Sequence, residues 1–113
     1  ISPSLVLNKK GKVDLVLGSA GSNRIRSAIV QVILNYLIKE MSLKDSIYSS
    51  RIHLETNELH VEPGINFSHG ILENKNIKFN SFSSINLFFG GVNSVSAKEA
   101  VADPRRGGYG IIC

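Results

Sequence analysis

The chain of 113 residues is long enough for one small domain, spanning residues 1–113, and too short for two. Its 42% apolar and 19% charged residues exclude a disordered protein, and no apolar run approaches the roughly 20 residues of a membrane span. The net charge of +4 is dispersed, which favours solubility over nucleic-acid binding, and the one cysteine, Cys113, excludes an internal disulfide.

Two short strands are the first predicted elements. Residues 4–8 (SLVLN) and 13–17 (VDLVL) are apolar runs, and the KKGK segment between them suits a hairpin turn. In the second run apolar residues occupy alternate positions, so we expect at least one face of this strand to be buried. A glycine-rich stretch, GSAGSNR at residues 18–24, follows directly.

A long amphipathic helix is predicted for residues 24–41. Apolar residues recur there at intervals of three and four, which is the strongest helical pattern in the chain. Ser22 or Asn23 is expected to cap the first turn. Because most of its circumference is apolar, we expect the helix to have neighbours on more than one side. A narrow polar stripe interrupts the apolar surface, formed by Arg24, Ser27, Gln31 and Asn35.

The rest of the chain predicts short elements. Helices are predicted at residues 42–50, capped by Ser42, and at residues 66–74. Strands are predicted at residues 51–55, 58–64, 77–82, 84–89 and 93–98. DPRRGG at residues 103–108 is typical of a turn. This order of elements predicts a layered α+β fold.

The stretch at residues 18–24 lies between a strand and a helix, where free backbone N–H groups and the helix dipole bind anions. A dinucleotide-binding turn requires GxGxxG, and here glycines stand only at positions 18 and 21. A phosphate-binding P-loop ends in Gly-Lys-Ser/Thr, and this stretch has no lysine. Two interpretations stay open: an oxyanion hole for an acyl-transfer intermediate, or a tight turn that only leads into the helix.

Two combinations of reactive residue types are disfavoured. His53, His60 and His69 are spaced seven and nine residues apart, which matches no metal-ligand pattern, so neither a metal nor another cofactor is predicted. The residue types of a serine triad occur at Ser19, Ser22, His53 and Asp103. No G-x-S-x-G turn fixes their geometry, so this hypothesis is disfavoured as well.

Two further groups have a functional and a structural interpretation. Four phenylalanines near Lys75 and Lys78 have the composition of a stacking platform for single-stranded nucleic acid: Phe79, Phe82, Phe88 and Phe89. Packing in the core is the favoured interpretation, and no nucleic-acid partner is expected. Asp103, Arg105 and Arg106 suit contact with an acidic substrate, but a turn held by Asp–Arg pairing is favoured.

Five segments resemble, in order, the motifs of one family. ISPSLVL is similar to M-S-P-T-I-V-V, and GSAGSNRI to GSPGGSRI. RIH followed by ELHVEPG is similar to P-R-[IF]-H and D-E-L-R-V-E-K-G. GGVNSVSA and AVADPRRGG are similar to G-S-x-N-S-I and A-x-D-P-R-R-x-G. Together these segments span nearly the whole chain, and they resemble the γ-glutamyltranspeptidase family, the glutathione hydrolases.

The resemblance implies an N-terminal-nucleophile (Ntn) hydrolase with a four-layer αββα fold. In that family the precursor cuts itself, and the new N-terminal threonine attacks γ-glutamyl amides such as glutathione. The chain would be the C-terminal portion of the small subunit, with the rest of that subunit and the large subunit as partners. The family's two oxyanion glycines fall on Gly21 and Ser22, and Ser22 departs from the pattern while keeping its backbone N–H. Bacterial members are commonly exported, which implies a periplasmic or secreted protein.

The nucleophile itself is expected to be absent from this chain. An N-terminal nucleophile must be Thr, Ser or Cys at the first position, because its own α-amine serves as the base. The chain starts with Ile1, and its one threonine is Thr56, in a predicted turn. We therefore expect these residues alone to be inactive and to be part of a longer enzyme. The alternative is a small basic binding module that uses the same scaffold without catalysis.

Overall fold

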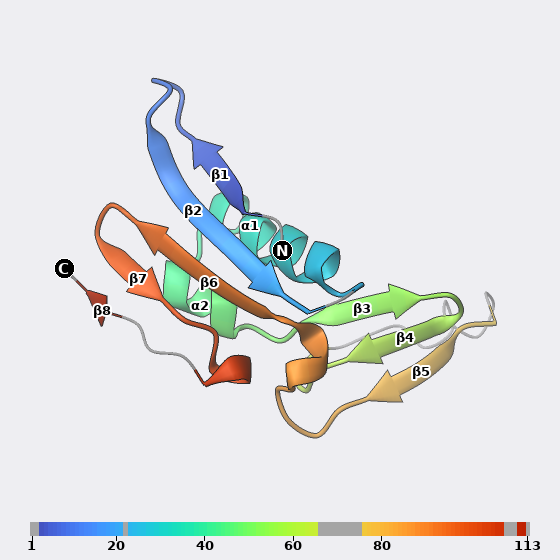
Figure 1. Cartoon of the computed structure of the whole chain (residues 1–113). Helices are drawn as coiled ribbons and strands as arrows, with labels where there is room; N and C mark the ends of the chain where they lie inside the picture. Colours follow the sequence, from blue (N-terminus) through green and yellow to red (C-terminus); the bar gives the residue numbers. More distant parts are fainter. Residues whose placement is uncertain (1–2, 22, 66–75, 108–110, 113) are drawn as a thin grey trace.

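The computed structural model describes the chain except for residues 1–2, 22, 66–75, 108–110 and 113 (Figure 1). Its larger sheet has the strand order β1-β2-β6-β7-β8. These strands are β1 (Ser4–Leu7), β2 (Val13–Ala20), β6 (Gly91–Ser96), β7 (Glu99–Val101) and β8 (Ile111–Ile112). The smaller sheet consists of β3 (Ile52–Glu55), β4 (Glu58–Val61) and β5 (Lys78–Ser81). The prediction of an α+β fold is confirmed.

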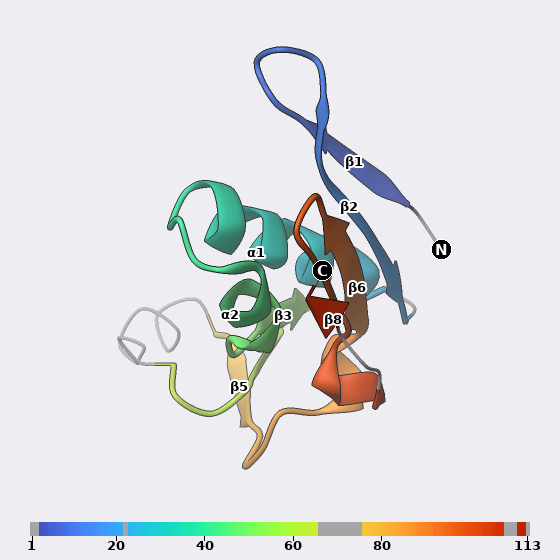
Figure 2. The same ribbon diagram turned by 90° about the vertical axis from the view of Figure 1, so that its left-hand side faces the viewer.

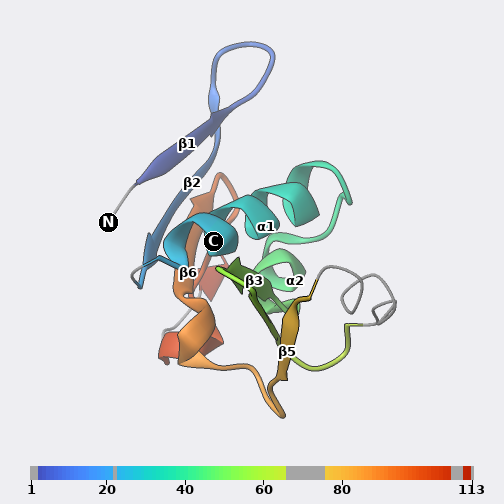
Figure 3. The ribbon, with the colours of Figure 1, turned by 90° about the vertical axis from the view of Figure 1, so that its right-hand side faces the viewer.

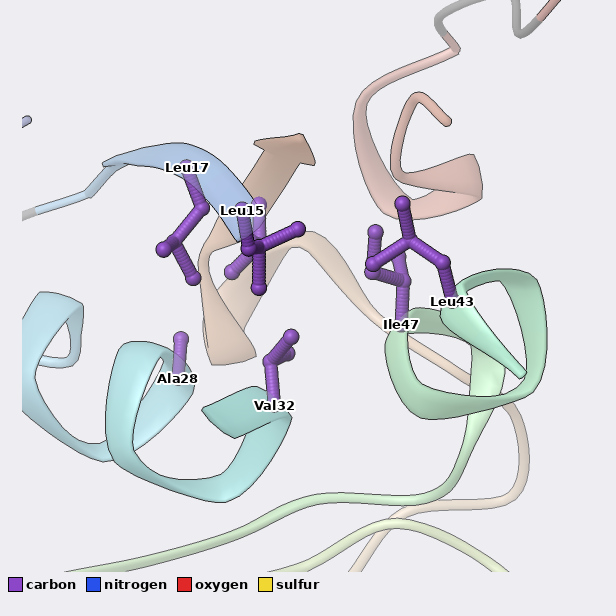
Figure 4. Packing of buried hydrophobic residues seen from close by; sticks show 7 residues of the cluster. Leu15, Leu17, Ala28, Val32, Leu43 and Ile47 are labelled. Carbon is purple, nitrogen blue, oxygen red and sulfur yellow. The ribbon is translucent and has the colours of Figure 1, made fainter. Parts of the chain in front are cut away.

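The helices α1 (Ile25–Leu37) and α2 (Leu43–Tyr48) cover one face of the larger sheet (Figures 2 and 3). The core forms there, because alternate residues of a strand point to the same face. Leu15 and Leu17 of β2 point toward Ala28 and Val32 of α1, and all four are almost completely buried (Figure 4). Complete burial of one leucine or valine side chain contributes about 1.5–3 kcal/mol. Val92, Leu43 and Ile47 complete the cluster.

The opposite face of the larger sheet carries an apolar row. Leu5, Val16, Val95 and Ala100 are paired in register across β1, β2, β6 and β7. The exposed fractions are 64% for Leu5, 38% for Val16 and 52% for Val95. Within the described residues, one face of this sheet is therefore covered by helices and the other presents apolar side chains to solvent.

The observed strands differ from the predicted ones in several places. The predicted strand at residues 84–89 is wrong: Leu87–Phe89 form a 3₁₀ helix, η1, whose capping residue Asn86 accepts a 2.9 Å bond from the Phe88 N–H. Strand β7 was not predicted, because its Glu-Ala-Val sequence is too short to show alternation. Strand β2 continues to Ala20, so the glycine-rich turn begins only at Gly21. The helix predicted at residues 66–74 lies outside the described residues.

Both described helices are shorter than predicted. Helix α1 ends at Leu37 and not at residue 41, and its N-cap, Arg24, makes no side-chain capping bond. The cap predicted at Asn23 is wrong, and Ser22 lies outside the described residues. In α2 the predicted cap is confirmed, since the Ser42 hydroxyl accepts a 3.1 Å bond from Asp45 N. No helix in the described part of the chain is long and apolar enough to cross a membrane.

The prediction that α1 has neighbours on more than one side is confirmed, because the larger sheet covers one side and β3 and α2 contact another, but a third side is exposed. The outer side of the helix exposes 42–73% of each of four apolar side chains: Val30, Leu34, Leu37 and the adjacent Ile38. The sheet covers one apolar side, and a second contact uses the polar stripe, as described below. The outer apolar side therefore remains accessible in the described structure.

Candidate functional site

The candidate site is the turn between β2 and α1. Strand β2 ends at Ala20, which pairs with Gly91 of β6. Gly21 follows with φ +137°, a conformation that residues with a Cβ rarely adopt. It is exposed, and the described loop and cap hydrogen bonds include none from its N–H group. Gly21 therefore lies exposed in the turn that leads into the N-terminal end of α1, a position where proteins can bind anions.

Gly90 packs closely behind this turn. A Cβ at Gly21 would lie 3.4 Å from the Gly90 Cα, so the two backbones are in contact. Gly90 has φ +78°, and a Cβ there would lie 3.3 Å from the carbonyl oxygen of Ala20. A side chain at position 90 would therefore crowd the end of β2. The sequence indicated Gly90 only as a break between strands, and its contact with the turn was not predicted.

Arg24 ties the end of the turn to η1. Its Nε donates a 2.9 Å hydrogen bond to the carbonyl oxygen of Phe88. Its guanidinium carbon also lies 4.5 Å from the centroid of the Phe88 ring. A hydrogen bond and a cation–π contact to the same residue fix the side chain in two ways. The helix thus begins from an anchored residue although it has no side-chain cap.

The polar stripe of α1 faces the smaller sheet. Ser27 Oγ lies 2.7 Å from Nδ1 of His53 in β3. The Gln31 amide accepts a 2.8 Å bond from the Ile52 N–H and donates a 2.8 Å bond to the Ile52 carbonyl. Asn35 donates a 3.3 Å bond to the carbonyl of Ser46 in α2. These side chains therefore hold α1 against β3 and α2.

Replacing Gln31 with leucine tests this contact. The change removes three hydrogen bonds, one of them to the Ser27 carbonyl, and leaves the Ile52 N–H and carbonyl without their partner, so we expect the free energy of unfolding to fall by about 1–3 kcal/mol. Arg26→Leu on the exposed side of α1 is the matched control, expected within about 0.5 kcal/mol of the original protein. Urea denaturation measures both, and equal effects would contradict the role of Gln31.

Four buried charges form a second feature, the buried-charge cluster of Arg51, Glu62, Asp103 and Arg105. Arg105 binds Glu62 at 2.5 Å and Asp103 at 3.1 Å, and Arg51 binds Asp103 at 2.6 Å. Two guanidinium and two carboxylate groups cancel in charge. Both carboxylates also accept hydrogen bonds from backbone N–H groups. Glu62 accepts from Arg51 and Asn86, and Asp103 accepts from Val92 and Arg105.

The neighbouring carboxylates offset the burial of Arg105 more fully than that of Arg51. Burial lowers the pKa of Arg51 from its ordinary value, although Asp103 opposes this effect. Burial also acts to lower the pKa of Arg105, but the hydrogen bond to Glu62 and the charges of both carboxylates raise it overall. The Arg51 Nε has no hydrogen-bond partner among the described residues. Arg105 is therefore the better paired cation of the cluster.

The buried-charge cluster reaches the segment behind the candidate site. Arg51 Nη1 lies 3.4 Å from the Phe89 carbonyl oxygen and 3.3 Å from that of Gly90. Because Gly90 contacts Gly21, the cluster supports the turn through one intervening residue. Asp103 and Arg105 are buried, and Asp103 caps the 3₁₀ helix η2 (Pro104–Arg106). These contacts support the structural interpretation of the DPRR segment over contact with a substrate.

Aromatic side chains collect beside β4. The His60 ring centroid lies 4.7 Å from that of Phe88, which lies 5.4 Å from Phe82 and 5.1 Å from Phe89. Phe89 is buried in this group. The mutual packing supports the core interpretation of these rings over a platform for nucleic-acid bases. In the described ranges, no group of three His, Cys, Asp or Glu side chains is placed to hold a metal ion.

The serine-triad hypothesis is contradicted by the positions of its members. Ser19 is buried between β2 and the helices, and its hydroxyl has no partner among the described residues. Asp103 binds the two arginines of the buried-charge cluster. His53 instead contacts Ser27 and Glu55, which sequence analysis did not select. Ser22 and His69 lie outside the described residues, so the structure does not describe their surroundings.

The α+β fold is that of an Ntn-hydrolase domain. A sequence model described as Gamma-glutamyltranspeptidase matches residues 1–113. The chain belongs to the γ-glutamyltranspeptidase family. The resemblance noted from five short motifs is therefore confirmed at the level of the family.

Solved structures and a curated relative agree with this assignment. The γ-glutamyltranspeptidase of Pseudomonas nitroreducens complexed with L-DON superposes with a TM-score of 0.76 at 24% identity, covering 99% of this chain and 61% of that one. A variant of the Helicobacter pylori enzyme superposes with a TM-score of 0.72 at 28% identity, covering 92% of this chain and 60% of that one. A glutathione hydrolase of Aspergillus flavus is 34% identical over 53 residues, 47% of this chain and 9% of that protein. The chain thus spans only part of these relatives.

Proposed function

We propose that this chain is part of a γ-glutamyltransferase or glutathione hydrolase and supplies its oxyanion hole. Gly21 and Ser22 would donate backbone N–H bonds to the oxygen that becomes charged during γ-glutamyl transfer. The observation that carries the proposal is the exposed Gly21, which lies with φ +137° in the turn that leads from β2 to α1. Membership of the family supports the same chemistry.

The proposed reaction needs a nucleophile from outside these residues. An N-terminal threonine hydroxyl attacks the γ-glutamyl carbonyl while its own α-amine takes the proton. The carbonyl oxygen becomes an oxyanion, and one correctly placed N–H donor stabilises it by about 3–4 kcal/mol. Collapse expels the amine and leaves an acyl-enzyme, which water or an acceptor amine then cleaves. Thr56 cannot serve, because it lies in the middle of the chain, in the turn between β3 and β4.

The partners in this proposal are the remaining parts of the enzyme. The apolar row of Leu5, Val16, Val95 and Ala100 would pack against the second sheet of an αββα sandwich. The outer apolar side of α1 would contact a further segment or the large subunit. Both surfaces are accessible here, and the chain covers 61% of the length of the P. nitroreducens chain. The substrate would be a γ-glutamyl compound such as glutathione.

Release of a chromophore from a γ-glutamyl anilide tests the proposal. We expect turnover by a longer protein that contains these residues and an upstream N-terminal threonine, and covalent labelling by L-DON. The 113-residue chain alone is expected to give no turnover, because it lacks the nucleophile. Enzyme-like turnover by the chain alone would contradict this account. Absence of turnover and labelling in the longer protein would instead favour a binding module.

A further inference from the structure

A chain of hydrogen bonds joins the segment around the start of α1 to β3, close to the candidate turn. It contains Asn23 and Ser27 from the start of α1, and His53 and Glu55 from β3. We propose that Glu55 and His53 are positioning residues that hold the first turn of α1, and with it the oxyanion amides, against β3. This inference rests on the proposed function, and the four residues are called the latch below.

Three contacts link the four residues of the latch in a row. Asn23 Nδ2 donates to Glu55 Oε1 at 2.8 Å. The second oxygen, Glu55 Oε2, lies 3.3 Å from His53 Nε2, and His53 Nδ1 lies 2.7 Å from Ser27 Oγ. Asn23 lies in the turn just before α1, and Ser27 lies in the first turn of the helix. His53 and Glu55 are two residues apart and share one face of β3.

One placement of protons satisfies every member of the latch. A neutral His53 with its proton on Nε2 donates to Glu55, while Nδ1 accepts the hydroxyl proton of Ser27. His53 is only 6% exposed, so its ring is confined to this position. Glu55 is partly exposed, with 40% of its side chain accessible. The carboxylate can therefore exchange a proton with solvent while the histidine stays enclosed.

The latch acts close to the proposed oxyanion amides. Asn23 stands two positions after Gly21, so its bond to Glu55 fixes the chain as it leaves the turn. Gly90 also contacts Gly21, and Phe88 contacts both Arg24 and the His53 ring. Loss of the latch would therefore remove one of several contacts that support the turn. Misplacement of catalytic groups by about 1 Å can cost on the order of 100-fold in rate.

The charged groups around Glu55 give the latch a pH dependence. Hydrogen bonds from Asn23 and then His53 lower the pKa of Glu55 from its ordinary value, and Arg24 on α1 adds a smaller effect. Because the pKa is lowered, the latch is complete above the ordinary glutamate value and is lost as the pH falls through the lowered one. The neighbouring Glu58 is paired with His60 and Lys78.

Glu55→Ala in the whole enzyme tests the latch, with Glu58→Ala as the matched control. Glu58 is the cross-strand partner of Glu55 but binds His60 and Lys78. For Glu55→Ala we expect kcat to fall on the order of tenfold with KM within about twofold. We also expect amide hydrogen exchange at residues 23–27 to rise on the order of tenfold. Glu58→Ala should leave both unchanged.

Glu55→Gln separates positioning from a general structural role. Its amide oxygen can accept from Asn23 and its NH₂ can donate to His53 in the other tautomer, so kcat at neutral pH should stay within about twofold. The increase in exchange at residues 23–27 as the pH falls through the lowered Glu55 pKa, corrected for intrinsic exchange, should disappear. A pH dependence equal to that of the original enzyme would overturn the role of Glu55.

The outcomes distinguish this inference from the proposed function. Unchanged exchange and kcat in Glu55→Ala, or equal effects in Glu55→Ala and Glu58→Ala, would overturn the latch even if Gly21 proves essential. If changes at Gly21 leave kcat unaffected, the oxyanion proposal fails, and a fall in kcat for Glu55→Ala would then need another origin. A fall in kcat and faster exchange in Glu55→Ala, together with an essential Gly21, support both.

Discussion

Replacing Arg105 with methionine is expected to lower the free energy of unfolding by about 3–5 kcal/mol, the usual cost of removing one partner from a buried ion pair. Arg105 contacts both Glu62 and Asp103, so the change leaves buried Glu62 without an ion-pair partner and Asp103 paired with Arg51 alone. It also removes bonds to the carbonyl oxygens of Ile47 and Ser49. Urea denaturation of the enzyme, monitored by circular dichroism, measures the loss.

Two further variants control this experiment. Arg106→Met changes the adjacent, exposed arginine and is expected to alter stability by less than about 0.5 kcal/mol. Arg51→Met should be destabilising but less so than Arg105→Met, because Arg51 pairs with one carboxylate and its Nε has no partner among the described residues. Similar stability of Arg105→Met and Arg106→Met would contradict a stabilising role for the buried-charge cluster.

Replacing Gly21 with alanine is expected to lower kcat by about 100- to 1000-fold, the usual cost of losing one oxyanion donor. At φ +137° an alanine is strained, so the backbone should rotate and the N–H should turn away from the oxyanion. The effect should fall mainly on kcat, because the charge develops only in the transition state. Steady-state kinetics with a γ-glutamyl anilide measure both parameters.

Gly11→Ala is the matched control for backbone strain. Gly11 also has a positive φ, +79°, in the hairpin turn between β1 and β2, and a Cβ there would meet nothing within 4 Å. The two variants should therefore lose comparable stability, on the order of 1–3 kcal/mol, while only the change at Gly21 lowers kcat. A kcat for Gly21→Ala equal to that of Gly11→Ala would reject the oxyanion assignment.

Local patterns in the sequence predicted much of the fold. The alternation of apolar residues predicted β2, the helical spacing of apolar residues predicted α1, and Ser42 indicated the start of α2. The predictions failed where local signals competed. The apolar residues Leu87–Phe89 were expected to extend as a strand, but the Asn86 side chain caps a short 3₁₀ helix there. Local propensity did not indicate this, since the cap depends on one side-chain bond.

The contacts around the candidate site were harder to predict. The family motif indicated Gly21, but no local pattern reports that Gly90 contacts it or that Arg51 binds Asp103, 52 residues away. The sequence showed the polar stripe of α1, but it did not show that this stripe contacts β3. The contact between Ser27 and His53 could be predicted only if the position of β3 beside α1 were already known. Such pairs depend on tertiary packing between distant segments.

The buried-charge cluster also constrains how the chain folds. Glu62 follows β4 of the smaller sheet, whereas Asp103 follows β7 of the larger one, and Arg105 binds both. Neither carboxylate acquires its full set of donors until the two sheets are side by side. Assembly of the two sheets should therefore be a late and cooperative event, so that neither half of the molecule reaches its native arrangement independently of the other.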